Sequence, residues 1–99
     1  MVSVTFASTE LPEKFGLEQN YPNPFNPTMV IRYKVPGTSH VRLEVYDLLG
    51  REAAILVDEE QNAGSHEITF DGSKLGSGIY FYRMKSGNYT KTQEMVLLK

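Results

Sequence analysis

The 99-residue sequence contains no cysteine and only two histidines. Without cysteine the chain forms no disulfide, no thiolate metal site and no cysteine nucleophile. No apolar run approaches the roughly 20 residues that a membrane-spanning helix needs. The 10 basic and 12 acidic residues leave a net charge of -2. This near balance argues against a nucleic-acid-binding face and against a module held on a membrane by charge.

Catalytic and metal-binding patterns are also scarce. His40 and His66 follow turn residues and have no second ligand at a metal-binding spacing, so we expect solvated histidines at strand starts. The acidic run of residues 58–60 lacks the further ligands of a calcium site and is expected in a solvated loop. Residues 76–78, Gly-Ser-Gly, are not followed by a helix that would bind phosphate. The sequence therefore predicts no enzyme, no metal site and no cofactor.

Hydrophobic alternation with a period of two runs through the chain and is typical of strands with one buried face. Every second residue from Met29 to Val35 is apolar. In residues 41–47 the two valines and the leucine point inward, while Arg42 and Glu44 point outward. No window shows helical spacing over three turns. The other expected strands are residues 15–17, 51–57, 66–71, 78–85 and 89–99.

Turn residues separate these strands. Gly50 closes Asp47-Leu48-Leu49-Gly50 and is expected at a positive φ in a tight hairpin loop. About seven short strands with glycine and proline turns indicate an all-β protein, an immunoglobulin-like antiparallel β-sandwich. The expected domain organisation is a linker or cloning remnant over residues 1–10 and a single domain over residues 11–99.

The stretch from Leu75 to Tyr80 reads Leu-x-x-Gly-x-Tyr just before the expected sixth strand. This is the place of the tyrosine corner in Greek-key sandwiches. In this interpretation Leu75 fills one end of the core, Gly78 allows a close approach of the chain, and the Tyr80 hydroxyl bonds to backbone a few residues upstream. An ordinary hairpin tyrosine is the alternative. The aromatic strand that includes Tyr82 would suit a sugar-binding platform only if its rings were exposed.

The least ordinary stretch is Asn20 to Thr28, NYPNPFNPT, with three prolines within six residues. Proline fixes its own φ, lacks an N–H donor and restricts the preceding residue, so this stretch is neither a helix nor a central strand. We expect a rigid, extended crossing that loses little entropy on folding and is anchored by the buried ring of Phe25. Its candidate recognition residues are Pro22, Asn23, Pro24, Phe25, Asn26 and Pro27.

The final residues, EMVLLK, continue the alternation. Met95 and Leu97 face one way and Val96 and Leu98 the other, so one pair must face the core. Lys99 is expected to be solvated and to contribute almost nothing to stability. An open edge strand of the sandwich could pair with another copy of the chain.

From Leu11 to Lys99 the sequence resembles the C-terminal sorting domain, type A, of the bacterial type IX (Por) secretion system. This family is related to the immunoglobulin-like domain of the flagellar hook-capping protein. The most specific motif is the stretch of residues 20–27, and Met29 departs from the pattern, in which a polar or β-branched residue is usual. The resemblance is carried by FGLEQNYPNPFNPTMVIRYKVP, VRLEVYDLLGRE, LGSGIYFYRMKSG and KTQEMVLLK.

The resemblance implies a non-catalytic signal at the C-terminus of a larger exported protein, often a hydrolase or an adhesin. Type IX machinery takes such proteins across the outer membrane after a separate Sec signal has crossed the inner one. A surface peptidase then commonly removes the domain. No nucleic acid and no stable membrane insertion are expected. Residues 1–10 show no signal peptide, which favours a module excised from a longer precursor.

The resemblance also places a basic residue at Lys99, and we expect the machinery to recognise it directly; a lysine that serves only solubility is the alternative. Leu97 and Leu98 are further candidates at this end. Two other functions stay open. One is a carbohydrate-binding or adhesion module attached to an enzyme, and the other is a passive structural spacer.

Overall fold

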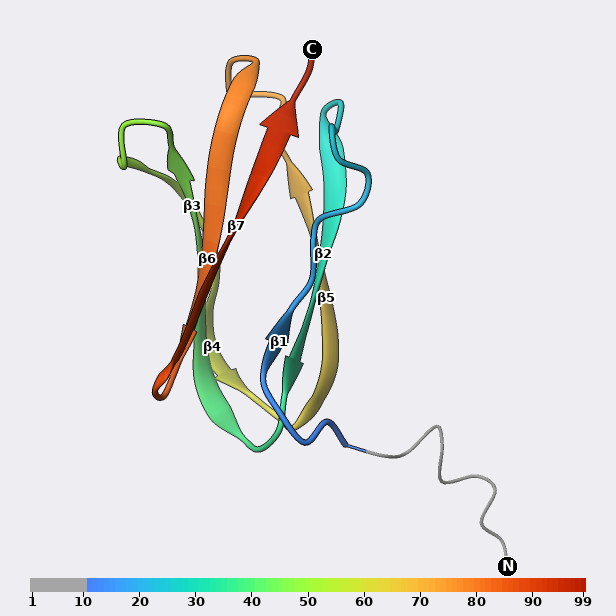
Figure 1. Cartoon of the computed structure of the whole chain (residues 1–99), viewed down its shortest axis with the longest axis vertical. Coiled ribbons are helices and arrows are strands. Elements are labelled where there is room, and N and C mark those ends of the chain that lie inside the picture. The colour runs from blue at the N-terminus through green and yellow to red at the C-terminus, as the bar shows by residue number, and fades with distance from the viewer. Residues whose placement is uncertain (1–10) are drawn as a thin grey trace, which may run out of the picture.

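The computed structural model describes residues 11–99, so the expected linker over residues 1–10 lies outside the described residues. The described chain folds as two antiparallel sheets that face each other, without a helix (Figure 1). The prediction of an all-β sandwich is confirmed. The strands are β1 (Gly16–Leu17), β2 (Thr28–Val35), β3 (Ser39–Asp47), β4 (Glu52–Gln61), β5 (Gly64–Asp71), β6 (Gly78–Ser86) and β7 (Tyr89–Leu97).

The strand order is β1-β2-β5 in one sheet and β4-β3-β6-β7 in the other. The chain changes sheet between β2 and β3, between β4 and β5, and between β5 and β6. The pairing of β3 with β6 therefore joins strands that are not consecutive in the sequence. This topology leaves β7 at the edge of the four-stranded sheet, next to the side where β1 closes the other sheet.

The core lies between the sheets and follows the predicted alternation. Every second residue from Met29 to Val35 is buried, and so are the inward residues of β3. On β7 the pair that faces the core is Met95 and Leu97. The other strands and the crossing contribute Leu17, Phe25, Val57, Phe70, Tyr82 and Met84.

Strand β4 differs from its prediction in length and regularity. Residues 58–60 belong to this strand and not to a loop, because its pairing with β3 continues to Ser39 opposite Gln61. The register of β4 against β3 shifts twice, between Leu43 and Glu44 and between Val45 and Tyr46. Irregular pairing of this kind breaks strict alternation along a strand.

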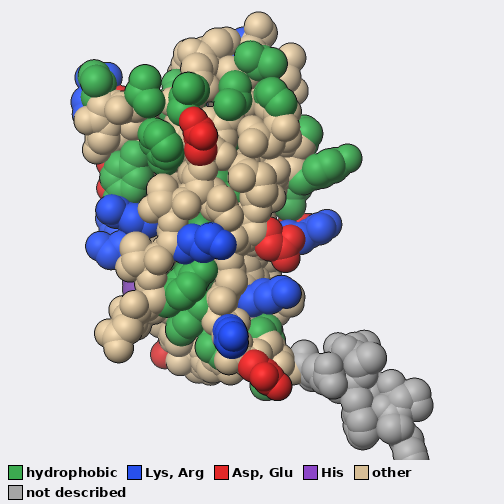
Figure 2. All heavy atoms as spheres, viewed as in Figure 1, with side chains coloured by type: hydrophobic (Ala, Val, Ile, Leu, Met, Phe, Trp, Pro, Cys, Tyr) green, Lys and Arg blue, Asp and Glu red, His purple; other side chains and the backbone are tan. Residues whose placement is uncertain are grey.

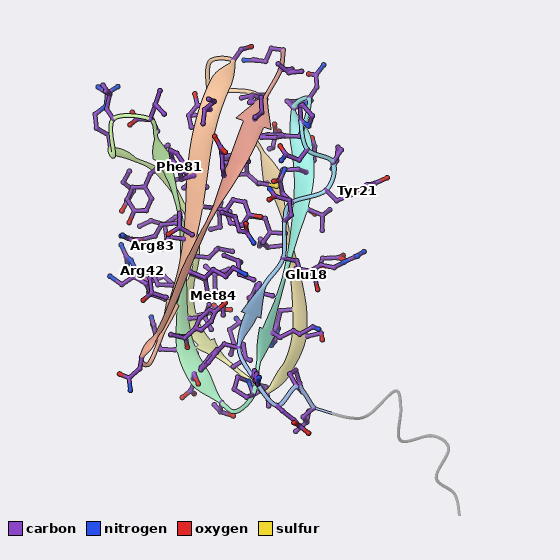
Figure 3. All side chains as sticks on the ribbon, in the orientation of Figure 1. Glu18, Tyr21, Arg42, Phe81, Arg83 and Met84 are labelled. Atoms are coloured by element: carbon purple, nitrogen blue, oxygen red, sulfur yellow. The ribbon has the colours of Figure 1, made fainter. Side chains whose placement is uncertain are left out.

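Glu44 points outward, as predicted, but its side chain is buried, with 3% of the residue's surface exposed. Arg42 and Tyr46 from the same strand cover its carboxylate and donate hydrogen bonds to it, the bond from Tyr46 at 2.5 Å. Arg83 lies over the Tyr46 ring, 4.7 Å from its centroid. Desolvation alone would raise the pKa of Glu44, but the donated bonds outweigh it and lower this pKa. Figure 3 shows Arg42 and Arg83 projecting from the four-stranded sheet away from the other sheet.

Candidate functional site

The crossing segment, defined as residues 20–27, lies beside the end of β7. Phe25 forms a parallel bridge with Leu97. Its N–H donates to the Val96 carbonyl at 2.8 Å, and its carbonyl accepts the N–H of Leu98 at 2.9 Å. The side-chain oxygen of Asn23 accepts the N–H of Val96 at 3.0 Å. Segments about 70 residues apart in sequence therefore form one hydrogen-bonded unit.

The chain before the crossing segment also runs along β7. The Gln19 side chain donates to the Glu94 carbonyl at 2.7 Å, and the Gln93 side chain donates to the Leu17 carbonyl at 3.0 Å. Further back, the ring of Phe15 stacks on Tyr89. The outer edge of β7 is thus covered by the stretch from residue 15 to residue 25.

Phe25 anchors the crossing segment as predicted, with 1% of its surface exposed. Its ring lies 6.2 Å from that of Phe70 and next to Leu97. Gly72 completes the contact, because a Cβ there would come within 3.2 Å of the Phe25 ring and 3.3 Å of Leu97. Sequence reasoning missed Gly72. Its only signal was its place in an Asp-Gly-Ser turn after an expected strand.

Apart from Asn20, which is buried, the other members of the crossing segment are exposed or half-buried. Pro22, Asn23, Pro24 and Asn26 are exposed, and Pro27 is half-buried. The segment bends at residues 22–24 and 26–27, so the extended crossing that we predicted is only partly correct. The three X–Pro peptide bonds are cis. Tyr21, with 78% of its surface exposed, projects away from the sandwich (Figure 3).

The loop from Gly72 to Ser77 contains the predicted corner. The Tyr80 hydroxyl donates to the Gly76 carbonyl at 2.8 Å, four residues upstream, and this bond is exposed. Leu75 packs against the core. Gly78 is required for another reason than the predicted close approach: its φ is +150°, and no neighbouring atom lies within 4 Å of the position that a Cβ would take. Gly50, with φ of +84°, takes the predicted positive φ in its hairpin.

Tyr82 makes a longer-range bond than Tyr80, and the sequence did not indicate it. Its side chain is fully buried, and its hydroxyl donates to the Glu18 carbonyl at 2.6 Å. Burial raises the pKa of this hydroxyl well above its ordinary value. The bond ties β6 to the chain just before the crossing segment. Asn20, also buried, donates to the Pro22 carbonyl at 2.7 Å and holds the start of the segment.

The last two residues follow the end of β7. Leu98 is exposed, whereas Leu97 is buried between the sheets. Lys99 is exposed but not simply solvated, which corrects our expectation. Its ammonium donates to the carbonyl oxygens of Ser73 at 2.6 Å and Leu75 at 2.8 Å. Figure 2 shows hydrophobic side chains gathered toward the end of the molecule where the C-terminus lies.

The histidines of the described chain differ from each other. His40 contacts the Asp58 carboxylate at 2.6 Å on the surface. His66 is half-buried and stacks on Tyr33, and its Nε2 lies 2.7 Å from the Asn62 carbonyl in an exposed contact, so it is solvated only in part. Among residues 11–99 no group of three or more histidine, aspartate or glutamate side chains could hold a metal ion. In the same range no helix could span a membrane.

A comparison with solved structures shows that this sandwich is similar to one part of a larger protein. The crystal structure of dimeric latent PorU from Porphyromonas gingivalis matches with a TM-score of 0.65 and 21% sequence identity. The match covers 86% of this chain but only 9% of that protein. At this identity the likeness shows a shared fold. A search of curated proteins found no match.

Comparison with protein families carries the assignment further. Residues 19–98 match the family described as "Secretion system C-terminal sorting domain". This range begins just before the crossing segment and ends at Leu98, so it contains both partners of the hydrogen-bonded unit at the end of β7. The chain belongs to the C-terminal sorting domains of the type IX secretion system.

Proposed function

We propose that this domain directs a larger protein, attached upstream, across the outer membrane, and that the type IX machinery recognises its terminal surface. We define the terminal surface as the crossing segment together with Val96, Leu98 and Lys99. Membership of the family indicates a C-terminal signal for type IX export, and such sorting domains are non-catalytic. The observation that carries the proposal is the pairing of Phe25 with the end of β7. This pairing joins the crossing segment and the last residues of the chain into one unit at the surface.

The position of the described chain's first residues supports this assignment. The blue start of the described chain and the C-terminus lie at opposite ends of the sandwich (Figure 1). A protein attached upstream of Leu11 would therefore leave the terminal surface accessible to a partner. Family membership implies contact with the secretion machinery and with a sorting peptidase like PorU. We propose that such a peptidase acts after export and that the cargo ends at the cell surface or outside the cell.

A reporter fusion tests the export function. Residues 1–99 would be fused to the C-terminus of a folded reporter that carries a Sec signal, in a host with a working type IX system. We expect the reporter at the cell surface or in the medium, and in the periplasm when the system is deleted. Periplasmic retention in the working host would contradict the proposal. Binding of the purified domain to insoluble polysaccharide would then favour a carbohydrate-binding module.

A matched pair of asparagine variants tests the terminal surface. Asn23→Ala removes the acceptor for the Val96 N–H and should loosen the crossing segment on β7. Asn26→Ala changes an exposed asparagine of the same segment whose side chain forms no hydrogen bond within residues 11–99. We expect Asn23→Ala to export less reporter than Asn26→Ala. Equal export of both, with equal melting temperatures, would show that recognition does not depend on this pairing.

A further inference from the structure

Lys99 and the loop of residues 72–77 form a built contact between the end of the chain and the tyrosine corner. The loop links β5 to β6 and is held from several sides. Its first N–H, from Gly72, donates to the Pro27 carbonyl at 2.8 Å, and the Leu75 N–H donates to the Gly72 carbonyl at 2.9 Å. The Asp71 carboxylate accepts the N–H of Ser73 at 2.9 Å. These bonds give the loop a defined shape.

The carbonyl oxygens of this loop divide between two kinds of donor. Those of Gly72 and Gly76 accept bonds from Leu75 and from the Tyr80 hydroxyl. Those of Ser73 and Leu75 converge on the Lys99 ammonium, at 2.6 and 2.8 Å. Two carbonyl oxygens at hydrogen-bond distance from one nitrogen are a site for a primary ammonium group, which offers three donors and a compact charge.

The backbone of Lys99 is held by the same loop. Its N–H donates to the Ser77 hydroxyl at 3.0 Å, and the preceding N–H, from Leu98, donates to the Phe25 carbonyl. Three bonds to the loop and one to the crossing segment therefore fix the last two residues. The charge environment agrees: the pKa of Asp71 is lowered, first by the Ser73 N–H and in smaller part by the positive charges of Lys74 and Lys99.

We infer that the loop of residues 72–77 is a binding site for a primary ammonium group. The group that occupies this site is the ammonium of Lys99, from the same chain. Lys99 is then a positioning residue. Its ammonium is turned toward the loop, and its effect on a partner acts through the pose of Leu98 and of the tyrosine corner. The effect of this site on export rests on the proposed function, whereas the site itself does not. It replaces the expectation that the machinery recognises the ammonium directly.

Hydrogen exchange on the full 99-residue chain tests the site without any export assay. Lys99→Met removes the ammonium and keeps the length of the side chain, and Lys91→Met is its control. Lys91 is an exposed lysine of β7, and its side chain has no hydrogen bond or ion pair with another residue of the range 11–99. We expect the amides of residues 75–77 to exchange about two- to fivefold faster in Lys99→Met, because an exposed charged hydrogen bond contributes modestly. Lys91→Met should match the wild type. Equal exchange in both variants would overturn the site.

Lysine labelling of the wild-type chain gives a second measurement that needs no variant. Acetic anhydride acylates free amines, so an ammonium held by two carbonyl oxygens should react more slowly than a solvated one. We expect Lys99 to be acylated at least about twofold more slowly than Lys91. Equal rates would also overturn the site.

Ser77→Ala separates positioning from direct recognition of the charge. This variant removes the acceptor for the Lys99 N–H and leaves the ammonium in place. Ser65→Ala, on the exposed face of β5, is the control. If Lys99 acts by positioning, the Ser77→Ala reporter should be exported less than the Ser65→Ala reporter. Full export of Ser77→Ala with reduced export of Lys99→Met would mean that the machinery recognises the ammonium. Failure of the wild-type reporter would instead contradict the proposed function and leave the exchange result standing.

Discussion

The two halves of β7 are held in different ways. In the second half, residues 94–97, Met95 and Leu97 are fully buried and the crossing segment bonds along the outer edge. In the first half, residues 89–93, three successive residues are exposed, and the outer contacts are the Phe15 ring and the Gln93 side chain. The second half, which leads into the terminal residues, is thus the half along which the crossing segment forms backbone hydrogen bonds.

The comparison explains why the crossing segment is rich in proline. An uncovered edge strand presents free N–H and C=O groups to other chains. A covering segment built from ordinary residues would present a new edge of its own. Pro22, Pro24 and Pro27 carry no N–H, whereas the N–H and the C=O of Phe25 are both used on β7. The segment therefore covers the end of β7 while offering few donors to a further strand.

Replacing the two phenylalanines that lie against β7 should show the largest difference between its halves. Phe25→Ala removes a buried ring and should lower the free energy of unfolding by roughly 3–5 kcal/mol. Phe15→Ala removes a half-buried ring stacked on Tyr89 and should cost about 1 kcal/mol. Urea denaturation of both variants measures the two values. Similar costs would mean that the halves are held equally.

Gly72 offers a test of packing at the second half. A Cβ there would press on the Phe25 ring and on Leu97, which are enclosed in the core and have little room to move. Gly72→Ala should therefore cost about 1–3 kcal/mol. Gly37→Ala is the control, since nothing lies near its added Cβ, and it should stay within about 0.5 kcal/mol of the wild type. A neutral Gly72→Ala in urea denaturation would show that this contact is loose.

Removing either tyrosine hydroxyl of β6 should lower the stability less than the Phe25 and Gly72 substitutions do. Tyr82→Phe leaves the Glu18 carbonyl without its donor and should cost about 1 kcal/mol, or about 4–8 °C in melting temperature. Tyr80→Phe deletes an exposed bond within one loop and should cost about half of that or less. Differential scanning calorimetry compares the two. A larger loss of stability in Tyr80→Phe than in Tyr82→Phe would mean that the Tyr80–Gly76 bond stabilises the fold more than the Tyr82–Glu18 bond does.

Local sequence pattern predicted the features that depend on neighbouring residues. Alternation identified the inward faces of β2 and β3 and separated β7 into two pairs, of which one had to face the core. The spacing of Leu75 and Tyr80 predicted the hydroxyl bond of the corner. Phe25 could be predicted as an anchor because it is the only large apolar residue among the prolines. Each of these features depends on residues within one strand or one turn, and such residues are close together in the sequence.

Features that depend on distant residues could not be predicted in the same way. Asn23 meets Val96 only because the sandwich brings segments 73 residues apart together. The close contact at Gly72 and the carbonyl oxygens around Lys99 likewise depend on three segments at once. Glu44 is buried on an outward face because Arg42 and Tyr46 fold over it, which alternation does not indicate.

A fall in pH should weaken the interactions next to the first half of β7 and leave those of the second half unchanged. Next to the first half, Arg83 pairs with Thr92 on β7 and with Glu44 on β3. The contacts between the crossing segment and β7 instead use only uncharged groups. The pKa of Glu44 lies below its ordinary value of 4.5 in the folded protein. A lowered pKa means that the carboxylate stabilises the fold above the unfolded pKa, and that this contribution is lost as the pH falls through the folded one.

Glu44→Gln isolates this contribution, since the amide keeps the shape of the side chain without its charge. Asp47 and Asp71, whose pKa values are lowered first of all by backbone N–H groups, titrate in both proteins and cancel in the comparison. The wild type should melt above Glu44→Gln at about pH 7, and the gap should narrow as the pH falls below about 4. At both pH values the exchange of the Val96 and Leu98 amides, corrected for intrinsic rates, should be the same in the two proteins as long as the fold persists. A gap that widens in acid would mean that the buried carboxylate destabilises β3. Faster exchange of Leu98 in Glu44→Gln would show that the two halves of β7 are coupled through the sheet.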